Sequence, residues 1–346
     1  MPKNKLSMQL KVEDFLPASD AEKESLIVMR KSVGFWKDGV RRLRKNKISM
    51  VSLVVILFVF ILSFAVPHFY PYSYEQQIRG SENLAPMEYS QKELSAMEAG
   101  ESVFPHILGT DNLGRDYAVR VMMGSRVSLT VGLVASCIIL LIGSIYGSVA
   151  GFFGGWVDMI MMRIVDMIYT VPDILIIVLL SVAFEQPLKA LAQKPGFQWI
   201  QIIGVNLISI FVVFALLYWV GMARIVRSQI LILKEQEYVT AARALGASSA
   251  HIIKKHLLTN CIGTLIVTTT LQIPSSIFTE SFLSFLGLGV AAPMPSLGSL
   301  ASVALNGMQS NPHRLFAPAI TISIIILSFN LLGDGLRDAF DPKLRD

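Results

Sequence analysis

The sequence predicts an all-α integral membrane protein with six transmembrane helices and with both termini in the cytoplasm. Of its 346 residues, 53% are apolar and only 16% are charged, whereas about 25% of residues are charged in a typical soluble domain. A soluble fold of this length could not bury so much apolar surface in one core. The charged residues are also segregated, which leaves long stretches of the chain nearly free of charge.

Four of these apolar stretches are clear candidates for membrane spans. A helix needs about 20 mostly apolar residues to cross about 30 Å of hydrocarbon. The stretches that meet this requirement with few or no charged residues are 48–66, 127–150, 200–222 and 315–332.

Two further stretches are long enough but contain charged residues. The stretch 261–285 includes Glu280, and the stretch 164–184 includes Asp166 and Asp173. With both counted as spans, 22 of the 30 Lys and Arg residues fall on the cytoplasmic side and 8 on the other side. Without the span 164–184 the split becomes 16 to 14. Because cytoplasmic loops carry the excess of positive charge, six spans are favoured.

This topology divides the chain into a cytoplasmic N-terminal segment, a first helix, an extracytoplasmic loop and a core with five helices. The first helix is expected to remain as an anchor and not to be removed as a signal sequence. It follows 47 residues in place of a short basic leader, and no small-residue cleavage site follows it. These parts are 1–47, 48–66, 67–126 and 127–346, and the core contains the cytoplasmic loop 223–260.

The end of the N-terminal segment combines aromatic residues with dense positive charge in the sequence FWKDGVRRLRK, residues 35–45. This pattern is typical of an amphipathic helix that lies in the cytoplasmic interface of the membrane. The alternative is a basic leader that only sets the orientation of the first span.

The sequence lacks the motifs of several kinds of catalytic and binding site. Its two cysteines, Cys137 and Cys261, lie in apolar stretches, which excludes a disulfide scaffold. No CxxC or HExxH motif and no Gly-Lys dipeptide occurs, so neither a zinc site nor a Walker A loop is predicted. The net charge of +5 is divided among loops, which favours membrane topology over nucleic-acid binding. We therefore expect no catalytic residue, metal or cofactor on this chain.

Glycines recur at steps of four in the second span and just after it, at Gly143, Gly147, Gly151 and Gly155. Residues at this spacing share one face of a helix, and the missing side chains allow close approach of another backbone. The stripe predicts tight packing within the subunit or against a partner.

Three carboxylates, Asp166, Asp173 and Glu280, fall at or near membrane depth. An unpaired carboxylate in lipid costs several kcal/mol, so each is expected to face protein or a water-filled path. They could line a translocation pathway, or they could cap helices and hydrogen-bond neighbouring helices.

The loop 223–260 predicts two short helices bent at Gly246. Residues 237–246 form an alanine-rich helix that ends at the glycine, and Ser248 and Ser249 are N-cap candidates for the second helix. Small residues at positions 241, 242 and 244 would allow this turn to enter a groove on a partner. From spacing alone, an inert folded loop is an equal alternative.

The Gly- and Pro-rich loop 286–314 predicts a closely packed loop with a short helix near 297–305.

Six stretches together resemble the inner-membrane permease subunits of ABC importers, in the dipeptide/oligopeptide/nickel family. The likeness is greatest to the second of the two permeases of oligopeptide and dipeptide systems, and the stretches occur in the expected order from Trp36 onward. They are 41–47 (RRLRKNK), 108–116 (LGTDNLGRD), 151–158 (GFFGGWVD), 237–246 (EYVTAARALG), 283–289 (LSFLGLG) and 329–338 (FNLLGDGLRD).

The resemblance implies the type I ABC importer permease fold and gives the loop 223–260 a role as the coupling element that docks into an ATP-binding subunit. Thr240 stands where the family pattern has its first glutamate, and Thr259 stands at its closing proline. The implied coupling helix comprises Glu237, Tyr238, Thr240, Ala241, Ala242, Arg243, Ala244, Leu245, Gly246 and Ala247.

The partners that the resemblance implies are a second homologous permease, two ATPase subunits that bind ATP and Mg²⁺, and an extracytoplasmic binding protein that delivers a peptide. Nickel or a metal chelate is the alternative solute, although His68, His106 and His313 form no ligand-spaced pair. A stand-alone secondary transporter is less well supported, because the sequence shows no internal repeat.

Overall fold

The computed structural model describes residues 34–290 and 292–340, and within these residues it is helical with no extended strand. One isolated β-bridge joins Thr110 and Asp116. The helices are α2 Phe35–Lys45, α3 Lys47–Phe64, η2 Val66–His68, α4 Gln91–Glu98, α5 Tyr117–Phe153, α6 Gly155–Thr170, α7 Asp173–Ala192, α8 Trp199–Ile203, α9 Val205–Leu217, α10 Trp219–Leu233, α11 Glu237–Ala244, α12 Ser249–His251, the π-helix η3 Ile252–Leu257, α13 Leu258–Asn260, α14 Ile262–Phe285, α15 Leu297–Leu305 and α16 His313–Phe340.

Six helical stretches in the described part of the chain are long and apolar enough to cross a membrane, as the sequence predicts. The short helix expected near 297–305 is also present, as α15. The six stretches are Lys47–His68, Tyr117–Phe153, Ile174–Ala192, Val205–Leu233, Ile262–Phe285 and His313–Phe340.

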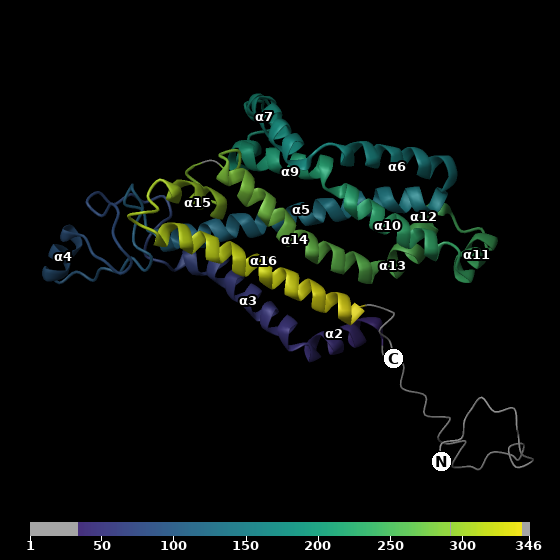
Figure 1. The fold of residues 1–346 in the computed structure, drawn as a ribbon, viewed down its shortest axis with the longest axis horizontal. Helices are drawn as coiled ribbons and strands as arrows, with labels where there is room; N and C mark the ends of the chain where they lie inside the picture. Colours follow the sequence, from purple (N-terminus) through teal and green to yellow (C-terminus); the bar gives the residue numbers. More distant parts are fainter. Residues whose placement is uncertain (1–33, 291, 341–346) are drawn as a thin grey trace, which may run out of the picture.

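The long helices α3, α5, α10, α14 and α16 run along the long axis of the molecule (Figure 1). The loop that contains α4 lies at one end, and α11 lies at the other. We call these the α4 end and the α11 end. The 37 residues of α5 correspond to about 55 Å at 1.5 Å per residue, so α5 is longer than the predicted span 127–150 and extends beyond the hydrocarbon.

The third predicted span, 164–184, is wrong in its bounds because two helices meet within it. Helix α6 ends at Thr170, and Val171 is extended, with φ −93° and ψ 138°. A residue before proline avoids the helical conformation, and Pro172 has no N–H to continue the ladder. Helix α7 therefore starts anew at Asp173 and turns away from α6 (Figure 1).

Three of the four glycines in the predicted stripe lie against α10. A Cβ atom at Gly143, Gly147 or Gly151 would come within 3 Å of atoms of Met222, the Ala223 carbonyl or the Arg227 carbonyl, respectively. The close contact is therefore made within the subunit. The prediction for Gly155 is wrong: α5 ends at Phe153, Gly155 has a φ of +51°, and its Cβ position is open.

Helix α2 packs on the last turn of α16. The rings of Phe35 and Trp36 lie 5.3 and 5.8 Å from the ring of Phe340. Gly39 faces the same ring so closely that a Cβ atom there would lie 2.4 Å from it. The predicted amphipathic helix is thus formed and packs on α16 of the same chain. Its place in the membrane interface stays a prediction. Residues 1–33 of the predicted segment 1–47 lie outside the described residues.

Candidate functional site

The predicted coupling loop forms a compact turn at the α11 end. Helix α11 begins after the extended residue Gln236, three residues after α10 ends. Its Val239 side chain is completely buried in the core, together with Ile230 of α10 and Ile252 of the following segment. One apolar anchor therefore fixes α11 to the two helices that flank it.

Gly246 ends α11 in a conformation that favours glycine, with a φ of +81°. The Gly246 N–H donates to the Arg243 carbonyl at 2.9 Å, and the Ala247 N–H donates to the Ala242 carbonyl at 3.0 Å. These two bonds form a Schellman motif, which satisfies the last carbonyls of a helix and reverses the chain. The bend at Gly246 follows from this geometry.

The second half of the loop is helical with an irregular centre. The Ser248 hydroxyl accepts from the His251 N–H at 3.4 Å at the start of α12. Ile252 and Leu257 are buried within the π-helical turn that follows. Asn260 donates to the Tyr238 hydroxyl at 3.2 Å and closes the loop onto α11. Serine capping is visible in the sequence, but the π-helical turn is not.

Two basic side chains fasten the loop to the end of α5. The guanidinium of Arg243 lies 5.0 Å from the centre of the Phe152 ring, within cation–π range. The ammonium of Lys234 donates to the Gly151 carbonyl at 3.0 Å. These contacts join α11 and the segment before it to α5 as well as to α10.

The outward surface of α11 is small and partly apolar. Leu245 is 88% exposed, and Thr240, Ala241 and Ala244 are also exposed. The small residues at 241, 242 and 244 are predicted to enter a groove on a partner. Ala242 is partly buried against the subunit's own core, so only Ala241 and Ala244 of these three are exposed. The other residues of the predicted coupling helix divide into the exposed Glu237, Tyr238, Arg243 and Gly246 and the partly buried Ala247.

Two of the three predicted intramembrane carboxylates contact other helices. Asp166 of α6 pairs with Arg224 of α10 at 2.7 Å, and both side chains are well exposed. Glu280 of α14 is completely buried and accepts from Ser128 of α5 at 2.7 Å and from Ser284 at 2.7 Å. These contacts favour the helix-bonding alternative. Asp173 is the first residue of α7, and its side chain lies outside the described part of the structure.

At the opposite end, residues 66–116, which we call the α4 segment, enclose a buried polar cluster. The two ring nitrogens of His106 lie 2.8 Å from Asp116 Oδ2 and 3.1 Å from Glu93 Oε1. Ser81 donates to the same oxygen of Glu93 at 3.0 Å. The sequence places these residues in the extracytoplasmic loop 67–126 and does not predict the cluster. Among the described residues, no group of three or more His, Cys, Asp or Glu side chains is arranged to hold a metal ion.

The cluster shifts two pKa values. Burial alone lowers the pKa of His106, but the hydrogen bonds and charges of Asp116 and Glu93 outweigh it, so the pKa is raised. Burial alone raises the pKa of Glu93, but hydrogen bonds from the Ser90 backbone, His106 and Ser81 outweigh it, so the pKa is lowered. Both shifts mean that the folded structure favours the charged forms of His106 and Glu93.

The motif 108–116 makes a tight turn that carries this cluster to the start of α5. Asp111 Oδ1 accepts from the Leu113 and Arg115 N–H groups at 2.8 and 3.0 Å. Asp116 caps α5 by accepting from the Val119 N–H at 3.0 Å. Gly114, with a φ of +71°, approaches the Ile78 carbonyl so closely that a Cβ atom would lie 2.2 Å from it. The motif therefore has a structural role that its residues alone do not reveal.

Comparisons with known proteins identify the family. The family described as binding-protein-dependent transport system inner membrane component matches residues 139–346. The chain belongs to this family. A second family, the N-terminal TM domain of oligopeptide transport permease C, matches residues 34–86.

Similar proteins extend the match over nearly the whole chain. The chain is 41% identical over 328 residues to the oligopeptide transport system permease protein OppC of Bacillus subtilis (strain 168), covering 95% of each. It is 42% identical over 338 residues to the dipeptide transport system permease protein DppC of the same organism, covering 97% of this chain and 95% of the relative. The glutathione transport system permease protein GsiD of Pectobacterium atrosepticum is 32% identical over 314 residues, covering 91% of this chain and 92% of the relative. With six candidate spans, this family member is a multi-pass protein of the bacterial inner membrane.

Proposed function

We propose that this chain is the permease subunit of an ATP-driven importer and forms half of the translocation pathway for peptides. The names of its relatives support peptides as the solute, and its family supports a binding protein that delivers the solute. A second homologous permease completes the pathway, and two separate ATPase subunits bind ATP and Mg²⁺. This subunit then carries no catalytic residue.

The observation that carries the proposal is the outward surface of α11, which is exposed on one side and rigidly attached on the other. Leu245 is an 88% exposed apolar side chain. Ala241 and Ala244 are also exposed, and their small side chains allow α11 to enter a groove on a partner. ATP binding is proposed to move the ATPase subunits and with them α11. The motion of α11 then shifts α10 and α5 between two arrangements. ATP acts here as a ligand that favours one of the two arrangements and so shifts the equilibrium toward it.

A further ion pair extends this attachment to α6. Arg227 of α10 donates to both carboxylate oxygens of Asp158 on α6. Arginine held by two parallel bonds is fixed in orientation as well as position. Helices α5, α6 and α10 are therefore proposed to move as one body with α11.

The test uses the complete importer, reconstituted in liposomes with its partner permease, ATPases and binding protein. Ala244→Trp places a large side chain on the exposed face of α11 and is expected to reduce peptide uptake at least about tenfold while ATP hydrolysis persists. Ala99→Trp, at an exposed position at the α4 end, is the matched control and is expected to leave uptake unchanged. Wild-type uptake by Ala244→Trp would contradict the docking role.

The solute is tested in the same liposomes with labelled peptides of two to five residues and with Ni²⁺. We expect ATP-dependent accumulation of at least one peptide class. Accumulation of Ni²⁺ without any peptide would contradict the peptide assignment and leave the role of α11 intact.

A further inference from the structure

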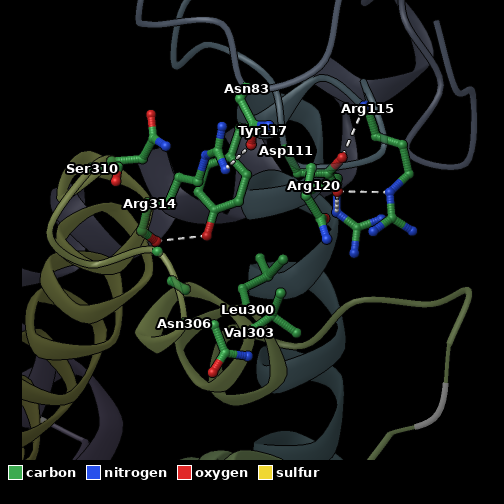
Figure 2. Close-up of a pocket in the computed structure, with 14 residues that line it drawn as sticks. Asn83, Asp111, Arg115, Tyr117, Arg120, Leu300, Val303, Asn306, Ser310 and Arg314 are labelled. Atoms are coloured by element: carbon green, nitrogen blue, oxygen red, sulfur yellow. Dashed lines mark hydrogen bonds and ion pairs between the residues drawn. The ribbon is translucent and has the colours of Figure 1, made fainter. Parts of the chain in front are cut away.

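A cavity of about 570 Å³ lies at the α4 end, between the α4 segment and the starts of two membrane-spanning helices. Arg120 comes from the second turn of α5, and Arg314 comes from the first turn of α16. Figure 2 shows Arg314 on one side of the cavity and Arg115 and Arg120 on the other. Helix α15 closes a third side with the apolar residues Leu300 and Val303 (Figure 2).

The charges around the cavity do not balance. Three guanidinium groups line it, and among the described residues that line it Asp111 is the single carboxylate. Arg115 makes the shorter ion pair with Asp111, with Nε 2.7 Å from Oδ2. Arg120 Nε lies 3.5 Å from the same oxygen, an ion pair without hydrogen-bond geometry. One carboxylate is therefore shared by two arginines, and the third guanidinium faces a neutral amide.

Several buried N–H groups in this cavity are unused. Arg314 is 8% exposed; its Nη1 donates to Asn83 Oδ1 at 2.8 Å. Its Nε and Nη2 are buried and have no hydrogen-bond partner within the described chain. Arg120 is 7% exposed, and its Nε is unused in the same sense. A buried charged donor without a partner costs more than a neutral one, so such groups call for a bound partner.

Arg314 is held in place by more than its side chain. The Tyr117 hydroxyl donates to the Arg314 carbonyl at 2.6 Å and links the first turns of α5 and α16 across 197 positions of sequence. Asn306, Ser310 and Asn311 add uncharged polar groups to the lining of the cavity. The unused donors therefore belong to a fixed frame, which is the arrangement expected of a binding site.

We propose that this cavity binds a compact oxyanion, a carboxylate or a phosphate, between Arg314 and Arg120. Guanidinium groups bind such groups through paired charge-assisted hydrogen bonds. The apolar wall of α15 accommodates the carbon skeleton that carries the anion. At the outer end of two spans the same chemistry has two sources, a free anion of the solution or the phosphate of a phospholipid headgroup. This site is separate from the α11 surface, and its test does not depend on transport.

The free-anion arm uses the full chain, purified in maltoside detergent and stripped of phospholipid. Sodium phosphate or citrate, compared with chloride at equal ionic strength, is expected to raise the thermal unfolding midpoint by about 2–4 °C. Arg314→Gln abolishes this rise, and Arg79→Gln, which removes an exposed positive charge of the same segment, retains it. Arg314→Lys and Arg120→Gln serve as second variants in case Arg314→Gln does not fold.

The lipid arm measures which phospholipids remain bound to the mildly extracted full chain by native mass spectrometry. A headgroup phosphate in the cavity gives one phospholipid adduct on the wild type and on Arg79→Gln that is at least tenfold depleted on Arg314→Gln or Arg120→Gln. A response in either arm supports the proposal and names the source of the anion. No response in either arm, or equal responses of wild type, cavity variants and Arg79→Gln, would overturn it.

Discussion

At the scale of single residues, the α4 segment depends on the charge of one histidine. His106 can donate from both ring nitrogens, toward Asp116 and Glu93, only as the imidazolium ion. Its pKa is raised, so its contribution to stability is complete below the ordinary histidine pKa of about 6.5 and is lost as pH rises through the folded pKa. The lowered pKa of Glu93 gives a contribution that is present above the ordinary glutamate pKa of about 4.3 and is lost as pH falls through the folded pKa.

We therefore predict that the α4 segment is most stable between about pH 4.3 and pH 6.5. Hydrogen exchange of residues 81–116, corrected for the intrinsic pH dependence of exchange, should show protection that falls above this range. His106→Gln is expected to cost about 1–3 kcal/mol of local stability, because it leaves a buried carboxylate without its charged donor. His68→Gln, at an exposed histidine, is the control. Unchanged protection in His106→Gln would refute the prediction.

A second residue-scale prediction concerns Glu280, which lies completely buried between α14 and α5. Glu280→Gln keeps one carbonyl oxygen that accepts from one of the two serines, Ser128 or Ser284, and its amide group can donate to the hydroxyl oxygen of the other, so it is expected to preserve the fold. Glu280→Leu removes every acceptor and is expected to destabilise the protein by about 1–3 kcal/mol. Thermal unfolding of the two variants in detergent measures the difference. Equal unfolding midpoints for Gln and Leu at this position would count against the hydrogen-bonding role.

The sequence identifies Glu280 as one of three carboxylates at or near membrane depth but cannot name its partner, because Ser128 lies 152 positions away. The same limit applies to Arg120 and Arg314. Each appears in the sequence as one basic residue near the end of a span, and only the fold brings both to one cavity. Local contacts are different: the capping by Ser248 and the turn at Gly246 involve neighbours in sequence, and their residue types predict them.

At the scale of elements, three glycines of α5 allow its close contact with α10. We predict that Gly147→Ala destabilises the protein by about 1–3 kcal/mol, because its Cβ atom would lie 2.3 Å from the Ala223 carbonyl oxygen. Gly221→Ala, on α10, is the matched control: nothing lies within 4 Å of its Cβ position. There the change should stabilise the helix by about 0.5–1 kcal/mol. If both variants shift the unfolding midpoint in the same direction, the proposed packing is incorrect.

Helix existence is predicted better than helix bounds for a physical reason. Hydropathy detects the part of a helix that faces lipid, so it finds 127–150 but omits the polar start of α5, which Asp116 caps beyond the apolar stretch. The same average joins α6 to α7 across Val171 and Pro172, although backbone sterics separate them. The glycine stripe correctly places its first three members on one face and fails at Gly155, where the helix has already ended.

At the scale of the whole molecule, the charge distribution and the shape together predict an orientation. The α4 segment and α11 lie at opposite ends of the long axis (Figure 1). The predicted topology places 22 of the 30 Lys and Arg residues on the side of α11 and the N-terminal segment. Because positive charge is retained in the cytoplasm, α11 is expected inside the cell, where an ATPase can reach it.

We predict that a cysteine at the α4 end is accessible from outside the cell and that one on α11 is not. Ser95→Cys on α4 and Ala244→Cys on α11 both replace exposed residues, and the native Cys137 and Cys261 are first changed to alanine. A membrane-impermeant maleimide should label Ser95→Cys in spheroplasts and label Ala244→Cys only after permeabilisation. Labelling of Ala244→Cys in sealed spheroplasts would reverse the orientation. It would also place α11 on the side of the membrane that lacks ATP, so the coupling role would fail with it.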